Sequence, residues 1–69
     1  MVEIFKTNVQ LQEQAEIVLG MLSKTFPEYK MNFDLYDCDH ILRIEGKNIV
    51  PEKIVELLKC NCYECEVLN

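Results

Sequence analysis

The first third of the chain changes its hydrophobic pattern close to Thr7. Residues 2–6 form a short run of β-favouring side chains, which predicts a first strand. Thr7 and Asn8 can each cap a helix by accepting a backbone N–H of its first turn, whereas Pro27 cannot be accommodated in a helix interior. We therefore expect a helix between Asn8 and Pro27. Its apolar positions recur every three or four residues, at Leu11, Ala15, Val18, Leu19, Leu22 and Phe26.

The middle of the chain has a period of two instead. Residues 30–35 alternate apolar with polar side chains, which indicates a strand with one buried and one solvated face. Residues 37–40 then read as a turn, and residues 41–45 as the next strand before Gly46 interrupts it. The two strands are predicted to form a hairpin.

The last part of the chain predicts a second helix and a closing strand. Pro51 suits a first helical turn, because its missing N–H is harmless there, and the apolar stripe that follows predicts a helix over residues 51–60. Residues 63–67 alternate again as a strand. The order strand, helix, strand, strand, helix, strand predicts an α+β, ferredoxin-like βαββαβ fold with two helices on one face of a four-stranded antiparallel sheet. With 69 residues we expect one domain, residues 1–69.

Composition and charge narrow the possible partners. The chain is 49% hydrophobic and 28% charged, as globular domains are. Its net charge of -5, with single scattered basic residues, argues against nucleic acid. No apolar run approaches the roughly 20 residues of a membrane span, and the N-terminal residues lack the features of a signal peptide. We expect no membrane insertion, a cytoplasmic location, a protein partner whose identity is open, and a monomer or weak dimer.

Several short motifs recur together along the chain. Thr7 is followed by apolar residues at fixed offsets, Ala15, Leu19 and Leu22, and residues 32–35 read Asn-Phe-Asp-Leu. These features, with residues 50–59 as a second helix and 63–67 as a final strand, resemble heavy-metal-associated domains, the fold of copper chaperones and of metal-ATPase N-terminal modules. The resemblance covers essentially the whole chain. It implies the ferredoxin-like fold and a role related to metal homeostasis.

The resemblance fails where that family binds metal. The two cysteines of the family's Met-Thr-Cys-x-x-Cys loop fall on Asn8 and Leu11, so neither soft thiolate that would hold Cu(I) or Zn(II) is present. Lys6 replaces the methionine. We interpret Asn8 as a helix cap and Leu11 as a core residue, and we expect no metal site by the family motif. Metal transfer by the two-cysteine mechanism is therefore not implied.

Other thiols offer alternative ligands. In the expected topology the first loop, the turn with Cys38 and His40, and the segment with Cys60 and Cys62 share one end of the sheet. These four residues are alternative ligands for Cu(I) or Zn(II), although their spacing is weaker than that of a structural zinc site. The alternative is that Cys38 is a surface thiol and His40 a solvated turn residue. Cys65 is expected on the inner face of the last strand as a buried free thiol.

Cys62 stands where the resembled family has glycine after a helix. A β-carbon at a left-handed helix end costs on the order of 1 kcal/mol, unless the turn is rebuilt or Asn61 takes that conformation. The sequence leaves open whether the replacement is drift, an introduced change or a thiol wanted there.

Two functional hypotheses from different classes follow. No nucleophile motif surrounds a serine or cysteine, and Cys62-x-x-Cys65 lies at a helix C-terminus, opposite to redox motifs, so we expect no enzyme. The first hypothesis is a non-catalytic protein-interaction or regulatory module that has lost the family metal site and needs no cofactor. The alternative is a divergent soft-metal protein that binds Cu(I) or Zn(II) through Cys60 and Cys62.

Overall fold

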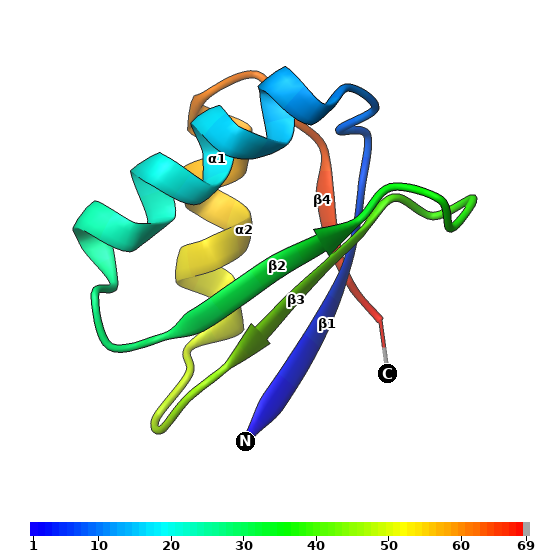
Figure 1. Cartoon of the computed structure of the whole chain (residues 1–69). Helices are drawn as coiled ribbons and strands as arrows, with labels where there is room; N and C mark the ends of the chain where they lie inside the picture. Colours follow the sequence, from blue (N-terminus) through cyan, green and yellow to red (C-terminus); the bar gives the residue numbers. More distant parts are fainter. Residues whose placement is uncertain (69) are drawn as a thin grey trace.

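The chain folds in the predicted order of elements (Figure 1). A computed structural model describes residues 1–68. The four strands form one antiparallel sheet, and the two helices lie on the same side of it, which confirms the ferredoxin-like α+β fold. The elements are β1 (Val2–Thr7), α1 (Gln12–Thr25), β2 (Lys30–Asp34), β3 (Ile41–Glu45), α2 (Pro51–Cys60) and β4 (Cys65–Leu68).

The sheet has the order β2-β3-β1-β4, so the strands of the two halves interleave. Phe5 of β1 is paired with Leu42 of β3 and with Val67 of β4, so β1 lies between β3 and β4. Helix α1 contacts β2, and α2 contacts β4. The strands β2 and β4 are therefore the two edges of the sheet, and each lies beneath a different helix. Neither helix, in the part of the chain described, is long and apolar enough to cross a membrane.

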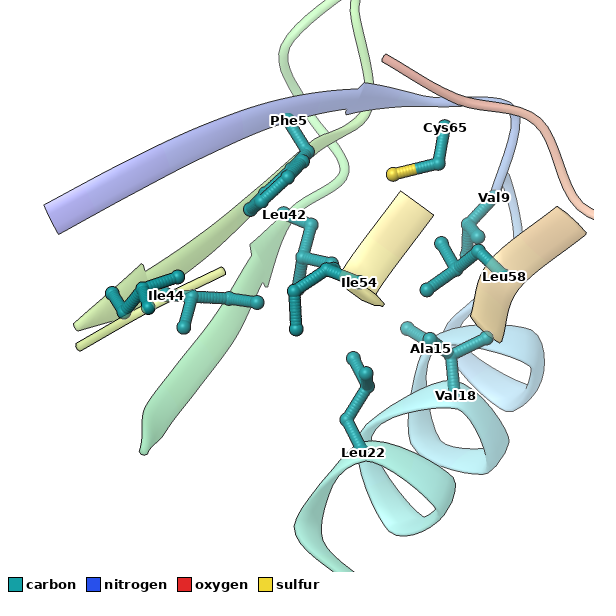
Figure 2. Close-up of a cluster of buried hydrophobic side chains, with 11 residues drawn as sticks. Phe5, Val9, Ala15, Val18, Leu22, Leu42, Ile44, Ile54, Leu58 and Cys65 are labelled. Carbon is teal, nitrogen blue, oxygen red and sulfur yellow. The ribbon is translucent and has the colours of Figure 1, made fainter. Parts of the chain in front are cut away.

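The core fills the space between the sheet and the helices (Figure 2). The three α1 positions Ala15, Val18 and Leu22 are buried as the helical period predicts, whereas Leu19 is only half-buried. Val9, from the loop before α1, joins the core although no periodicity singled it out. The buried set comprises Phe5, Val9, Ala15, Val18, Leu22, Leu42, Ile44, Ile49, Ile54, Leu58 and Cys65.

Several element boundaries differ from the sequence prediction; β1 and β4, for example, each end one residue later than predicted, at Thr7 and Leu68. Helix α1 begins at Gln12 rather than directly after Asn8. Strand β2 ends at Asp34 because the Asp34 Oδ1 atom accepts the backbone N–H of Tyr36 at 3.2 Å and turns the chain out of the sheet. Strand β4 begins at Cys65 because residues 61–63 form the turn that follows α2. Helix α2 itself, Pro51–Cys60, has the predicted bounds.

Candidate functional site

Three connections meet at one end of the sheet: the loop after β1, the hairpin between β2 and β3, and the turn after α2. The Thr7 hydroxyl donates to the His40 carbonyl at 2.6 Å, and the Thr7 N–H donates to the Asp39 carbonyl at 3.1 Å. The side-chain oxygen of Asn8 accepts the backbone N–H of Glu64 at 2.8 Å. The predicted meeting of these three segments is therefore confirmed.

Thr7 is the buried polar residue at the centre of this junction. Its hydroxyl donates to the hairpin and accepts the N–H of Val9 at 3.2 Å, so both functions of the hydroxyl are used. The second bond turns the chain sharply after β1 and directs the Val9 side chain into the core. Thr7 thus ties β1, the hairpin and the start of the loop together.

The predicted roles of Asn8 and Leu11 are both wrong. Asn8 does not cap α1, because its side-chain oxygen is engaged by the turn after α2. Leu11 is not in the core: it is the N-cap residue of α1, and its side chain is 59% exposed. Leucine has no side-chain acceptor, so Leu11 cannot bond the free N–H groups of the first helical turn. A side chain within the helix instead reaches back to the residues that precede it. The Oε1 atom of Gln14 accepts the N–H groups of Gln10 and Leu11, each at 3.1 Å.

The turn after α2 has the bonding pattern of a Schellman motif. The Tyr63 N–H donates to the Leu58 carbonyl at 3.0 Å, and the Cys62 N–H donates to the Lys59 carbonyl at 3.1 Å. Cys62 has a φ of 68°, so the cysteine itself takes the left-handed position that glycine usually occupies. Neither a rebuilt turn nor a left-handed Asn61 removes the cost of its β-carbon.

The four cysteines have different environments. Cys38, Cys60 and Cys62 are exposed free thiols, whereas Cys65 is buried on the inner face of β4, as predicted. Burial raises the pKa of the Cys65 thiol from 9.0 to about 11, and the ammonium of Lys59 offsets a smaller part of that rise. Cys65 is therefore a protonated thiol at neutral pH and a poor nucleophile or metal ligand.

The hairpin brings together three groups that can ligate a cation. Ligand atoms of Asp37, Cys38 and Asp39 lie within 4.8 Å of one another. Within residues 1–68 this is the one group of three or more such side chains, and it contains neither His40 nor the cysteines of the α2 turn. Its carboxylates have other partners: Asp37 accepts the Asp39 N–H at 2.9 Å, and Asp39 lies 3.7 Å from the Lys6 ammonium. The structure thus groups Cys38 with two hard oxygen ligands.

His40 follows this group and takes a left-handed conformation, with φ of 46°. It is half-buried rather than solvated, and its Nδ1 atom is buried without a hydrogen-bond partner among residues 1–68.

Two exposed large apolar residues, Leu11 and Tyr36, belong to connections at the same end of the molecule, and the sequence analysis missed their exposure. The Tyr36 side chain is 103% exposed relative to its reference, which is unusual for a large aromatic residue. Residues on either side of Leu11 line an open hollow of about 480 Å³ together with the hairpin. We call Leu11, Leu35, Tyr36 and this hollow the hairpin patch; the hollow is lined by Gln10, Gln12, Asn32, Phe33, Asp34, Leu35 and Tyr36. One signal was available: Tyr36 is an aromatic residue that breaks the period of two after Leu35.

Comparison with known proteins adds no name to this geometry. No family model matches the chain, and no curated protein matches it significantly.

Proposed function

We propose that this chain is a small non-catalytic protein-interaction or regulatory module, related in fold to heavy-metal-associated domains but without their metal site. The observation that carries the proposal is the use made of the two positions where that family has cysteines. Asn8 is a structural acceptor for the turn after α2, and Leu11 is an exposed apolar residue at the start of α1. The loop that would hold a metal ion is here a structural junction beside an apolar surface.

The hairpin patch is the surface that we assign to the partner. Tyr36 is the most exposed of the large hydrophobic residues in the part of the chain described, and Leu11 is also exposed; apolar residues that gather beside a hollow are typical of interaction sites. Tyrosine supplies a large contact area with few rotatable bonds, which suits it to interfaces. The exposed carboxylates of Asp34 and Asp37 flank it. A fitting partner has an apolar pocket rimmed by basic groups.

Free thiols support the expected compartment. All four cysteines are unpaired, and three of them are exposed. Such thiols persist in a reducing environment such as the cytoplasm.

The first test is a metal titration, because it separates this proposal from the soft-metal alternative. The reduced protein is titrated with Cu(I) and with Zn(II) against a competing chelator, and the stoichiometry is read by native mass spectrometry. We expect no binding beyond that of the Cys60→Ser/Cys62→Ser variant. One-to-one binding that this variant loses would overturn the proposal in favour of a relocated metal site at the α2 turn.

The second test addresses the partner surface. Immobilised wild-type protein and a Leu11→Ser/Tyr36→Ser variant are compared for the proteins that they retain from a lysate. Ile17→Ser is the matched control, because Ile17 is an apolar residue of α1 that is 60% exposed, and Leu11 is the N-cap of the same helix. We expect a partner that the wild type and the Ile17 control retain and the double variant loses. Equal retention by all three would exclude the hairpin patch as the docking surface.

A further inference from the structure

The edge strand β4 has backbone groups that face away from the sheet. The Gly46 N–H donates to the Met1 carbonyl at 3.0 Å, which identifies that pair as hydrogen-bonded in the β1–β3 ladder. Because successive residues of a strand direct their backbone groups to opposite sides, β1 bonds β4 through its even-numbered residues. The N–H and C=O groups of Cys65 and Val67 therefore lie on the outer edge of β4. An edge of this kind is a template for a further strand.

A shallow apolar groove runs beside this edge. It has a volume of about 490 Å³ and lies between α2 and β4. Val55 and Val67, both half-buried, form its apolar part. Charged residues of α2 border it, with Glu52 and Glu56 towards the start of the helix and Lys59 near its end. A strand added at the outer edge of β4 would extend the sheet beneath the groove. A helix lying above that strand, beside α2, would then cover the groove's open side.

We propose that the occupant of this groove is a second copy of the chain, related by a two-fold axis that passes close to Val67. Such an axis pairs β4 with β4 in antiparallel fashion and sets the two α2 helices antiparallel to each other. Helix α2 contacts β4, so the same operation that pairs the two β4 strands brings the two α2 helices side by side.

The charges along α2 favour this occupant over an unrelated strand. In an antiparallel helix pair centred between Val55 and Glu56, Glu52 of one copy is opposite Lys59 of the other. Symmetry repeats the pair, so the dimer has two such contacts. Val55, next to the centre, meets the same region of the other copy. Glu56 also lies next to the centre and meets its own copy, which opposes association, so the two Glu52–Lys59 contacts and the apolar Val55 and Val67 are what favour a second copy. The other edge, β2, has the exposed charges of Lys30 and Asp34 at its ends, which protect an edge from pairing.

The dimer leaves the proposed partner surface uncovered. The hairpin patch belongs to the connection of β2 with β3, and β2 is the edge opposite β4. Two copies of the patch would then lie on one particle, which allows bivalent binding of a partner that has two matching sites. The dimer does not depend on that function, because its contacts use different residues.

The test is sedimentation equilibrium of the reduced wild-type protein over about 1 μM to 1 mM, a range that spans weak association. A reductant is present so that no disulfide links the exposed cysteines. We expect a reversible dimer. The variant Lys59→Glu should raise its dissociation constant about tenfold or more, because two attractive contacts become repulsive. The double variant Glu52→Lys/Lys59→Glu reverses both charges and should restore dimerisation to within about threefold of wild type.

Two further variants keep the test decisive. Lys53→Glu makes the same charge change on α2 but borders a different groove, so it should change the dissociation constant by less than about threefold. Val67→Pro removes an outward N–H without affecting the bonds to β1, and it should abolish the dimer while circular dichroism shows a folded chain. A wild type that stays monomeric at every concentration overturns the proposal and leaves the groove for a different protein. Equal weakening by Lys53→Glu and Lys59→Glu overturns it as well.

Discussion

The side-chain oxygen of Asn8 accepts the backbone N–H of Glu64 at 2.8 Å, across 56 positions of the sequence. This bond connects the loop after β1 with the turn after α2. The N–H of Glu64 directly precedes β4, so the bond positions the start of that strand. A residue in the loop after β1 thus contributes to the assembly of the sheet.

Replacing Asn8 tests this role. Asn8→Ala removes the acceptor and should lower the free energy of unfolding by about 0.5 to 1.5 kcal/mol, the usual contribution of such a bond. Asn8→Asp keeps an oxygen acceptor and should lose less than half as much in about 0.5 M salt, where repulsion from neighbouring carboxylates is screened. Urea unfolding of the three proteins measures both values. An equal loss in the two variants would show that the bond contributes nothing.

The two leucines that the helical period placed together differ in their contribution to stability. Leu22 is fully buried, so Leu22→Ala should lower the free energy of unfolding by about 2 to 5 kcal/mol through lost contacts and a cavity. Leu11→Ala removes the same atoms from an exposed side chain and should change it by less than about 0.5 kcal/mol. Thermal or urea unfolding compares them. Similar losses would mean that Leu11 has a core role after all.

The two glycines of the chain should respond to alanine in opposite directions. A β-carbon on Gly46 would lie 2.6 Å from the Cδ1 atom of Tyr29, a ring held by a hydrogen bond from its hydroxyl to the Asn48 carbonyl at 3.1 Å. Gly46→Ala should therefore destabilise the protein by about 1 to 3 kcal/mol. A β-carbon on Gly20, in the middle of α1, meets no atom within 4 Å. Gly20→Ala should stabilise by about 0.5 to 1 kcal/mol.

A double variant isolates the contact at Gly46. In the Tyr29→Ala background the ring is absent, so adding Gly46→Ala should cost less than about 0.5 kcal/mol. If the cost of the alanine were unchanged in that background, the close approach of Tyr29 would not be its cause.

The sequence predicted the fold well because the pattern of each element agrees with the topology. Helix α2 has its predicted bounds because Pro51 fixes its first turn and the apolar stripe fixes the face that it buries. The start of α1 was wrong for a physical reason: Thr7 and Asn8 are good caps locally, but tertiary partners, the His40 carbonyl and the Glu64 N–H, engage both side chains. Local propensity cannot show such competition.

The candidate site was less predictable for the same reason. Topology was enough to bring the three connections together, but the positions of individual side chains depend on turn geometry. The Asp37 carboxylate accepts the Asp39 N–H at 2.9 Å, and this bond closes the turn of the hairpin. Cys38, between the two aspartates, therefore lies close to carboxylates. The exposure of Tyr36 follows from the turn at Asp34, which ends β2 before the aromatic residue. Neither turn produces a repeating pattern of apolar and polar residues, so the sequence pattern could not reveal it.

Cys62 permits a test of backbone strain. Its φ of 68° is costly for a residue with a β-carbon, and its N–H is held by the Lys59 carbonyl. Cys62→Gly should raise the free energy of unfolding by about 0.5 to 1 kcal/mol, the relief of strain less the greater freedom of glycine in the unfolded chain. Cys62→Ala keeps the β-carbon and should show no gain. A gain in both variants would point to the thiol, not to the backbone, as the source of instability.

The buried thiol of Cys65 should make stability fall at alkaline pH. Because burial raises its pKa from 9.0 to about 11, the folded chain keeps a proton between these values that the unfolded chain has released. Folding is then opposed by deprotonation, so the contribution of the protonated thiol is complete below about pH 9 and is lost as the pH approaches 11. The loss should amount to about 1 to 3 kcal/mol.

The control for this pH dependence is Cys65→Val, which fills the inner face of β4 with a β-branched residue and has no proton to release. Every other ionisable group is common to both proteins, so the difference between the two unfolding curves isolates the thiol. Urea unfolding at pH 8 and pH 10.5 should show the difference growing in favour of the valine variant as the pH rises. Parallel curves would mean that Cys65 ionises as easily in the folded chain as in the unfolded one, and that the inner face of β4 is open to water.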